Sequence, residues 1–226
     1  REAMAPLIIA GGGVLYAGAC DTLARFAAAH GIPVTETQAG KSALAHDHPL
    51  NLGAVGVSGT AAANAAAEAA DLILAVGTRL GDFATGSWAL FRNPSRKVVA
   101  LNVQAFDAGK RLAAPLVADA DLGLQALSAA LAGHRAPDVW LATCQAALPA
   151  WRAAAASATA ASNTALPTDA QVLGAVRRAM PQGAIVVAAA GGLPGELHKL
   201  WNAAAPGSYH LEYGYSCMGY EVAGGM

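Results

Sequence analysis

The segment Pro6-Leu7-Ile8-Ile9-Ala10-Gly11-Gly12-Gly13 decides the fold, because an apolar run of strand length stops at three consecutive glycines. An Ala-rich segment, residues 17–30, follows and has the composition of a helix, with Asp21 near its first turn. Gly31 is a helix stop signal, and residues 32–37 form a second strand-like run. The segment therefore predicts a βα unit followed by the next strand.

The same alternation of strands and helices continues along the chain. We expect a helix at 58–70, strands at 72–77, 97–103 and 116–118, and a helix at 121–132. The predicted strands are continuously apolar, as expected for a parallel sheet that helices cover on both faces. The sequence therefore predicts an α/β fold, with a doubly wound parallel sheet in a nucleotide-fold middle domain, residues 1–133.

Two further regions follow this domain. Residues 134–166 are dominated by Ala, with Ser, Thr and Asn near the end, and predict a helix followed by a flexible connector. Residues 167–226 predict a helix, a strand at 184–190, a glycine turn into a short helix, a strand at 210–215 and the beginning of another helix. Two strands cannot complete a doubly wound sheet, so we expect an incomplete second α/β domain with uncovered apolar faces.

The composition argues against several classes of partner. The 226 residues are 55% hydrophobic with a formal net charge of -1, which supports a sizeable core and gives no basic footprint for nucleic acid or an anionic membrane. Cys20, Cys144 and Cys217 are widely spaced and predict neither a disulfide framework nor a zinc site. With no membrane-spanning run and no signal peptide, we expect a soluble cytoplasmic protein without nucleic-acid or membrane partners.

The triple glycine has a functional and a structural interpretation. Backbone NH groups at Gly11–Gly13 could hold a phosphate where the following helix begins. However, Tyr16 stands where a dinucleotide-binding motif has its third glycine, and Glu36 only loosely matches the acid that would hold a ribose. A structural turn is the commoner use of such glycines.

Two other polar groups also have two interpretations. His46 and His48 flank Asp47 in a loop, a spacing that suits a metal, but turn residues are the commoner interpretation because no third ligand follows. Arg79 and Asp82 follow a central strand, either at a ligand site or, more commonly, as an ion pair. We therefore expect no metal site in this chain.

Two glycine-containing loops follow the last two predicted strands. Gly191–His198 leads from a buried strand into a helix, and Gly214–Glu221 repeats this arrangement after the next strand. The carboxyl ends of parallel strands meet at one edge of a sheet. We therefore expect these two loops to form one rim.

Four segments, Glu36–Lys41, Val76–Phe83, Gly86–Phe91 and Glu212–Glu221, carry a family resemblance. Through them, the chain resembles thiamine-diphosphate enzymes of the acetohydroxyacid synthase type over essentially its whole length. It looks most like those members that hydrolyse a carbon–carbon bond of a cyclic 1,2-diketone in inositol catabolism, releasing a deoxyglucuronic acid. The resemblance implies that the chain is a fragment of such an enzyme, comprising its middle domain and the start of its diphosphate-binding domain.

The resemblance also implies a cofactor pocket on the second domain. Met218 would support the bent V shape of thiamine diphosphate, and Ser216 would offer its backbone carbonyl to the 4'-amino group of the cofactor. Gly191, Gly192 and Cys217 would line the pocket. An unbranched thioether adapts to an irregular gap between two rings, but Met218 as an ordinary core residue is the alternative.

His198 has two interpretations of equal weight. It faces the substrate near the glycine loop 192–195, or it caps the short helix that follows this loop.

Two parts of the family pattern are missing. A Gly-Asp-Gly motif and a later Asn hold Mg2+ and the diphosphate, and a Glu on a separate N-terminal domain starts the ionisation of the cofactor. In this chain Gly81-Asp82 is followed by Phe83. We therefore expect no catalytic residue in the fragment, no bound thiamine diphosphate or Mg2+, and no activity in isolation. The parent enzyme is expected to be a homo-oligomer that acts on a small cyclic polyol diketone.

Three alternatives remain open from the sequence. The parent could be another thiamine-diphosphate lyase or synthase of the same family. The chain could also be a free-standing nucleotide-binding module that uses Gly11–Gly13, or a non-catalytic scaffold domain.

Overall fold

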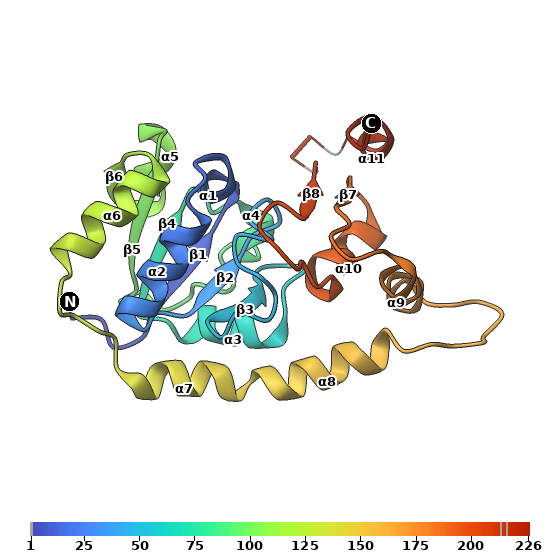
Figure 1. The fold of residues 1–226 in the computed structure, drawn as a ribbon. Coiled ribbons are helices and arrows are strands. Elements are labelled where there is room, and N and C mark those ends of the chain that lie inside the picture. Colours follow the sequence, from blue (N-terminus) through green and yellow to red (C-terminus); the bar gives the residue numbers. More distant parts are fainter. Residues whose placement is uncertain (1, 213, 216) are drawn as a thin grey trace.

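The computed structural model describes residues 2–212, 214–215 and 217–226 and has two lobes (Figure 1). The nucleotide-fold lobe, residues 5–158, contains a six-stranded parallel sheet with the strand order β3-β2-β1-β4-β5-β6. Its strands are β1 (Pro6–Ala10), β2 (Val34–Glu36), β3 (Asn51–Ala54), β4 (Leu72–Val76), β5 (Lys97–Asn102) and β6 (Ala114–Val117). This is the strand order of the doubly wound dinucleotide fold, so the predicted fold class is confirmed.

The central strand β1 is buried along its whole length. Its alternate residues serve the two faces of the sheet, since Ile8 belongs to one apolar core and Leu7 and Ile9 belong to the other. The strand pairs with β2 on one side and with β4 on the other, where Ile9 lies opposite Thr35 and Ala75, respectively. A strand that packs on both faces has no polar side, which explains the continuous apolar run.

Helices cover both faces of this sheet. α1 (Gly12–Tyr16), α2 (Cys20–His30) and α6 (Ala120–Ala130) contribute to the core that contains Ile8. The opposite core takes residues from α3 (Ala61–Ala69), α7 (Asp138–Ala146) and the start of α8 (Leu148–Ala158). The one-turn helices α4 (Asp82–Thr85) and α5 (Ala105–Ala108) and a 3-10 turn, Lys110–Leu112, complete the lobe.

α7 and α8 occupy most of the segment that the sequence predicts as a helix and a connector. Trp140 on α7 is buried, and its Nε1 donates a hydrogen bond to the carbonyl oxygen of Pro6 at 2.8 Å. Cys144 is buried in the same core. Residues 159–168 contain no helix or strand. α7 therefore helps to close one face of the nucleotide-fold lobe, while the predicted domain boundaries near 133 and 166 stay a prediction.

The second lobe, called the C-terminal lobe, spans the described residues of 168–226. It contains α9 (Asp169–Ala179), β7 (Val186–Ala188), α10 (Gly192–Leu200), β8 (Tyr209–Leu211) and α11 (Tyr220–Ala223). Thr168 and Gln171 form a capping box that starts α9. β7 and β8 pair in parallel, and a small apolar core includes Leu173, Leu197 and Trp201. In the part of the chain that the structure describes, no helix is both long and apolar enough to cross a membrane.

Among the elements that the sequence does not predict are β3 and α1. β3 follows the loop at 46–48, and its residues Asn51–Ala54 have little strand character. Instead, Asn51 orders this edge strand, because its Nδ2 donates to the carbonyl oxygen of Ala45 at 3.2 Å and its Oδ1 accepts from the Gly53 amide at 2.8 Å. α1 begins within the triple glycine, so the helix expected at 17–30 begins only at Cys20.

The turn after β1 packs against the turn after β4, backbone to backbone. The amide of Gly11 donates to the carbonyl oxygen of Val76 at 2.8 Å, and the amide of Gly13 donates to that of Gly77 at 3.0 Å. A Cβ atom on Gly11 would lie 2.3 Å from the Gly77 oxygen, and one on Gly13 would lie 2.6 Å from Gly77 Cα. There is no room for a side chain at either position, so these glycines have a structural function here.

We expect Gly11→Ala to lower the free energy of unfolding by about 1–3 kcal/mol, because the new methyl group forces the two turns apart. Gly81→Ala is the matched control, since its Cβ meets nothing within 4 Å and its φ is -68°. Urea unfolding of the two variants and the wild type measures the difference. Equal stability of Gly11→Ala and Gly81→Ala would show that the turns tolerate a side chain.

Candidate functional site

A group of buried polar side chains lies at the carboxyl end of β2 and around β3. Glu36 ends β2 and is 2% exposed, and Lys41 in the following turn is 5% exposed. Asn51, the first residue of β3, and Thr60, the N-cap of α3, are also buried. Full burial of charged side chains is uncommon in soluble proteins unless they are paired. This end of the sheet therefore combines unusual electrostatics with the position at which open α/β sheets place their ligands.

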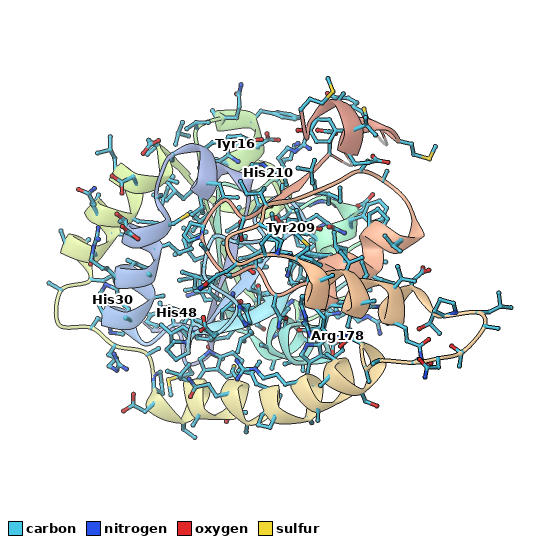
Figure 2. All side chains as sticks on the ribbon, turned by 45° about the vertical axis from the view of Figure 1, so that its right-hand side comes forward. Tyr16, His30, His48, Arg178, Tyr209 and His210 are labelled. Carbon is cyan, nitrogen blue, oxygen red and sulfur yellow. The ribbon has the colours of Figure 1, made fainter. Side chains whose placement is uncertain are left out.

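Glu36 and Lys41 shape each other's ionisation. Burial raises the pKa of the Glu36 carboxyl group, while the Lys41 charge and the Leu44 amide, which donates to Glu36 Oε1 at 3.0 Å, act to lower it. Burial lowers the pKa of the Lys41 ammonium group, and the Glu36 charge opposes that shift. The ammonium nitrogen lies 5.7 Å from the centroid of the Tyr209 ring, which contributes a cation–π contact. Figure 2 shows Tyr209 in the interior, where the two lobes meet.

A cavity of about 350 Å³ lies beside this pair. It is bounded by β3, by α8 with Trp151, and by the end of α10 with Trp201. Glu36 and Lys41 line its interior and Arg177 of α9 contributes a further cation. A cavity of this size with an apolar wall and a few polar groups is in the range of small-molecule sites.

His198 reaches from α10 into the nucleotide-fold lobe. The side chain is completely buried, and its Nδ1 lies 2.9 Å from the Ser58 hydroxyl oxygen, which also accepts a hydrogen bond from Gln38 Nε2 at 2.8 Å. Burial lowers the pKa of His198 to about 3, and the Lys41 charge acts in the same direction. The imidazole is therefore neutral at physiological pH. This contact differs from both sequence interpretations, substrate-facing and helix-capping, neither of which included the nucleotide-fold lobe.

The two predicted glycine loops lie at the carboxyl ends of adjacent parallel strands. β7 leads into Gly191 and Gly192 at the start of α10, and the chain beyond β8 leads to α11, which contacts β7 (Figure 1). Gly191 has φ of 146°, a conformation that other residues rarely adopt. Cys217 is exposed and Met218 is 80% exposed. Met218 is thus not a core residue of this chain, whereas Ser216 lies outside the described residues.

His46 and His48 make structural contacts, whereas Arg79 and Asp82 do not pair with each other. The amide and Nδ1 of His46 lie 2.9 and 3.3 Å from the carbonyl oxygen of Ala203, and His48 Nδ1 accepts from the Leu50 amide at 3.2 Å. Within residues 2–212, 214–215 and 217–226, no three His, Cys, Asp or Glu side chains are grouped to hold a metal ion. Arg79 and Asp82 both belong to the part of the chain that the structure describes. Their side chains are exposed, and no ion pair joins them.

Sequence reasoning missed the grouping of Glu36, Lys41 and His198. The sequence suggests Glu36 only as a loose match to a ribose-binding acid and Lys41 only as part of a segment with family resemblance, and His198 is far away along the chain. The available signal was a Glu at the end of an otherwise uncharged strand, because a charged group there needs a partner once the sheet is covered.

The fold and the rim together define a class of protein: a doubly wound α/β nucleotide-fold domain followed by a second α/β unit with a glycine rim. Residues 1–127 match the family described as "Thiamine pyrophosphate enzyme, central domain", and the chain belongs to this family.

Curated relatives extend the similarity along almost the whole chain. A "3D-(3,5/4)-trihydroxycyclohexane-1,2-dione hydrolase" of Clostridium perfringens (strain 13 / Type A) is 40% identical over 96% of this chain. Proteins of the same name in Bacillus cereus (strain ZK), there numbered 2, and Geobacillus thermodenitrificans (strain NG80-2) are 40% and 39% identical over 98% and 99% of it. The chain spans 38% of the length of each of these relatives.

We expect the chain to lose stability through His198 as the pH falls from 6.5 toward about 3, because the unfolded imidazole takes up a proton in this range and the buried one does not. This one group should remove about 1.4 kcal/mol of unfolding free energy per pH unit. His198→Asn should abolish that component, and His210→Asn, at an exposed histidine, is the control. Urea unfolding across this range tests it, and an unchanged pH slope in His198→Asn contradicts the assignment.

We expect FAD, NAD and ADP to leave the melting temperature unchanged, because the Gly11 and Gly13 amides already donate to backbone carbonyls and are not free for a phosphate. Thermal shift assays at increasing nucleotide concentration, against inorganic phosphate at equal ionic strength, provide the measurement. A saturable rise with a nucleotide alone would support the free-standing nucleotide-binding module instead.

Proposed function

We propose that the chain is the central domain and the beginning of the cofactor-binding domain of a hydrolase that depends on thiamine diphosphate and Mg2+. The parent enzyme cleaves a carbon–carbon bond of a cyclic 1,2-diketone, trihydroxycyclohexane-1,2-dione, to form 5-deoxyglucuronate in inositol catabolism. The observation that carries this proposal is the similarity of about 40% identity to hydrolases of this name over almost the whole chain.

The rim supplies the residues proposed to hold the cofactor. Gly191 and Gly192 bring bare backbone to the start of α10, where a Cβ on Gly192 would meet nothing within 4 Å. Met218 presents its thioether outside the apolar core, as a side chain that supports a ring system must. Cys217 and Ser216 complete the proposed set. When bound, thiamine diphosphate supplies a carbon nucleophile for a carbonyl group, while the protein binds and orients it.

The chain alone is proposed to be inactive. Mg2+ prefers carboxylate and other oxygen ligands and bridges them to phosphate oxygens. The Gly-Asp-Gly motif that supplies such ligands in this family does not occur in the sequence. A rim that contacts only the organic part of the cofactor would not hold its charged diphosphate.

We propose that the parent is a cytoplasmic homo-oligomer, and the exposed apolar side chains near the rim support the second part of this proposal. Met218, Tyr220 and Val222 are exposed around α11 and would be covered by further protein surface in such an assembly. Another lyase or synthase of the same family is the alternative, and it would differ in the product formed from the diketone.

Expression of the longest open reading frame that includes these residues tests the proposal. We expect hydrolysis of trihydroxycyclohexane-1,2-dione that requires both thiamine diphosphate and Mg2+, and a Met218→Ala variant with roughly tenfold weaker cofactor binding, equivalent to about 1.4 kcal/mol. In calorimetry, the 226-residue chain should show negligible affinity for the cofactor with Mg2+. Turnover without the cofactor, or micromolar affinity of the short chain, would contradict the proposal.

A further inference from the structure

α10 belongs to both lobes of the molecule. Its last turn buries Leu197 and Leu200 in the core of the C-terminal lobe, while His198, between them in sequence, enters the nucleotide-fold lobe. Its first turn is different, because Gly191 and Gly192 are exposed. The helix therefore has one anchored end and one open end, and the open end carries the proposed cofactor loop.

The contacts of His198 form a short hydrogen-bond chain. Gln38 Nε2 donates to the Ser58 hydroxyl oxygen, and this hydroxyl group in turn is hydrogen-bonded to His198 Nδ1. The imidazole lies near the backbone of Glu36 and Thr37 at the end of β2. Among the described residues, Nε2 has no hydrogen-bond partner within bonding distance. An imidazolium would not suit this place, since Lys41 already supplies a positive charge.

Other contacts near the end of α10 also join the two lobes. The His46 amide donates to the carbonyl oxygen of Ala203 at 2.9 Å, and the Gly207 amide donates to the Ser42 hydroxyl oxygen at 3.1 Å. These contacts lie beyond the helix, in the segment between α10 and β8. His198 makes the contact within the helix itself, six residues after Gly192 and about 9 Å along the axis at 1.5 Å per residue.

We propose that His198 is a positioning residue: through Ser58 and Gln38 it fixes the Gly191–Gly192 loop relative to the nucleotide-fold lobe. Because a helix is a rigid element, a contact that fixes one end also restricts the position of the other end. The nucleotide-fold lobe thus sets the position of a cofactor loop that it does not itself contain. The role assigned to the loop rests on the proposed function, whereas the mechanical coupling does not.

Hydrogen–deuterium exchange of the 226-residue chain, without cofactor, tests the coupling. His198→Ala should accelerate exchange at the first turn of α10, where the Gly195 amide donates to Gly191, by about tenfold or more, and leave the amides of β4 unchanged. His198→Asn should restore much of the protection, because its amide replaces Nδ1 toward Ser58. His210→Ala, at an exposed histidine of the same lobe, is the matched control and should behave as wild type.

Ser58→Ala provides a second variant that keeps the imidazole in place. It should accelerate exchange in the same turn, to a smaller extent. Equal acceleration in β4 would overturn the proposal, because it would show a general loss of stability, and unchanged exchange at 191–195 in both variants would overturn it directly. Because no cofactor is present, either result is independent of the test for thiamine-diphosphate chemistry.

Discussion

The contact between two glycine turns, one after β1 and one after β4, constrains the whole nucleotide-fold lobe. It lies where the strand order of a doubly wound sheet reverses, which is the usual place for a ligand. Here the turns touch so closely that the Gly11 and Gly13 amides are bonded to the opposite backbone. The crevice is therefore closed by main chain at this point. The buried polar side chains gather at the ends of β2 and β3 instead, where α10 and β8 of the C-terminal lobe cover them.

This arrangement makes the two lobes depend on each other. Glu36 and Lys41 are titratable groups taken out of water; burial raises the pKa of Glu36 and lowers that of Lys41, and each opposes the shift of the other. Tyr209 and His198 cover them from the C-terminal lobe. If the C-terminal lobe moved away, Glu36 and Lys41 would be exposed to solvent. Burial would then no longer shift the pKa values of Glu36, Lys41 and His198. The electrostatics of one lobe is thus completed by residues of the other.

The sequence predicts what local patterns determine, and misses what distant residues determine. Continuous apolar runs identify β1, β4 and β5, because a strand covered on both faces needs such a run. The common rim follows from two strand–glycine–helix segments and the rule for parallel strands. The sequence does not predict β3, because Asn51 orders this strand through hydrogen bonds and not through apolar packing. The contact of His198 with Ser58 could not be predicted either, since it joins residues 140 positions apart and produces no periodic pattern in the sequence.

The three cysteines differ in environment, and the one on the rim, Cys217, is the exposed one. Desolvation in the core beside α7 raises the pKa of the Cys144 thiol to about 12, and burial together with the charges of Asp21 and Glu36 raises that of half-buried Cys20. Only the thiolate reacts rapidly with electrophiles. Cys217, by contrast, is exposed to solvent on the loop beyond β8. A maleimide fluorophore would thus attach there first, and the natural sequence carries its own labelling position for following the approach of whatever binds the rim.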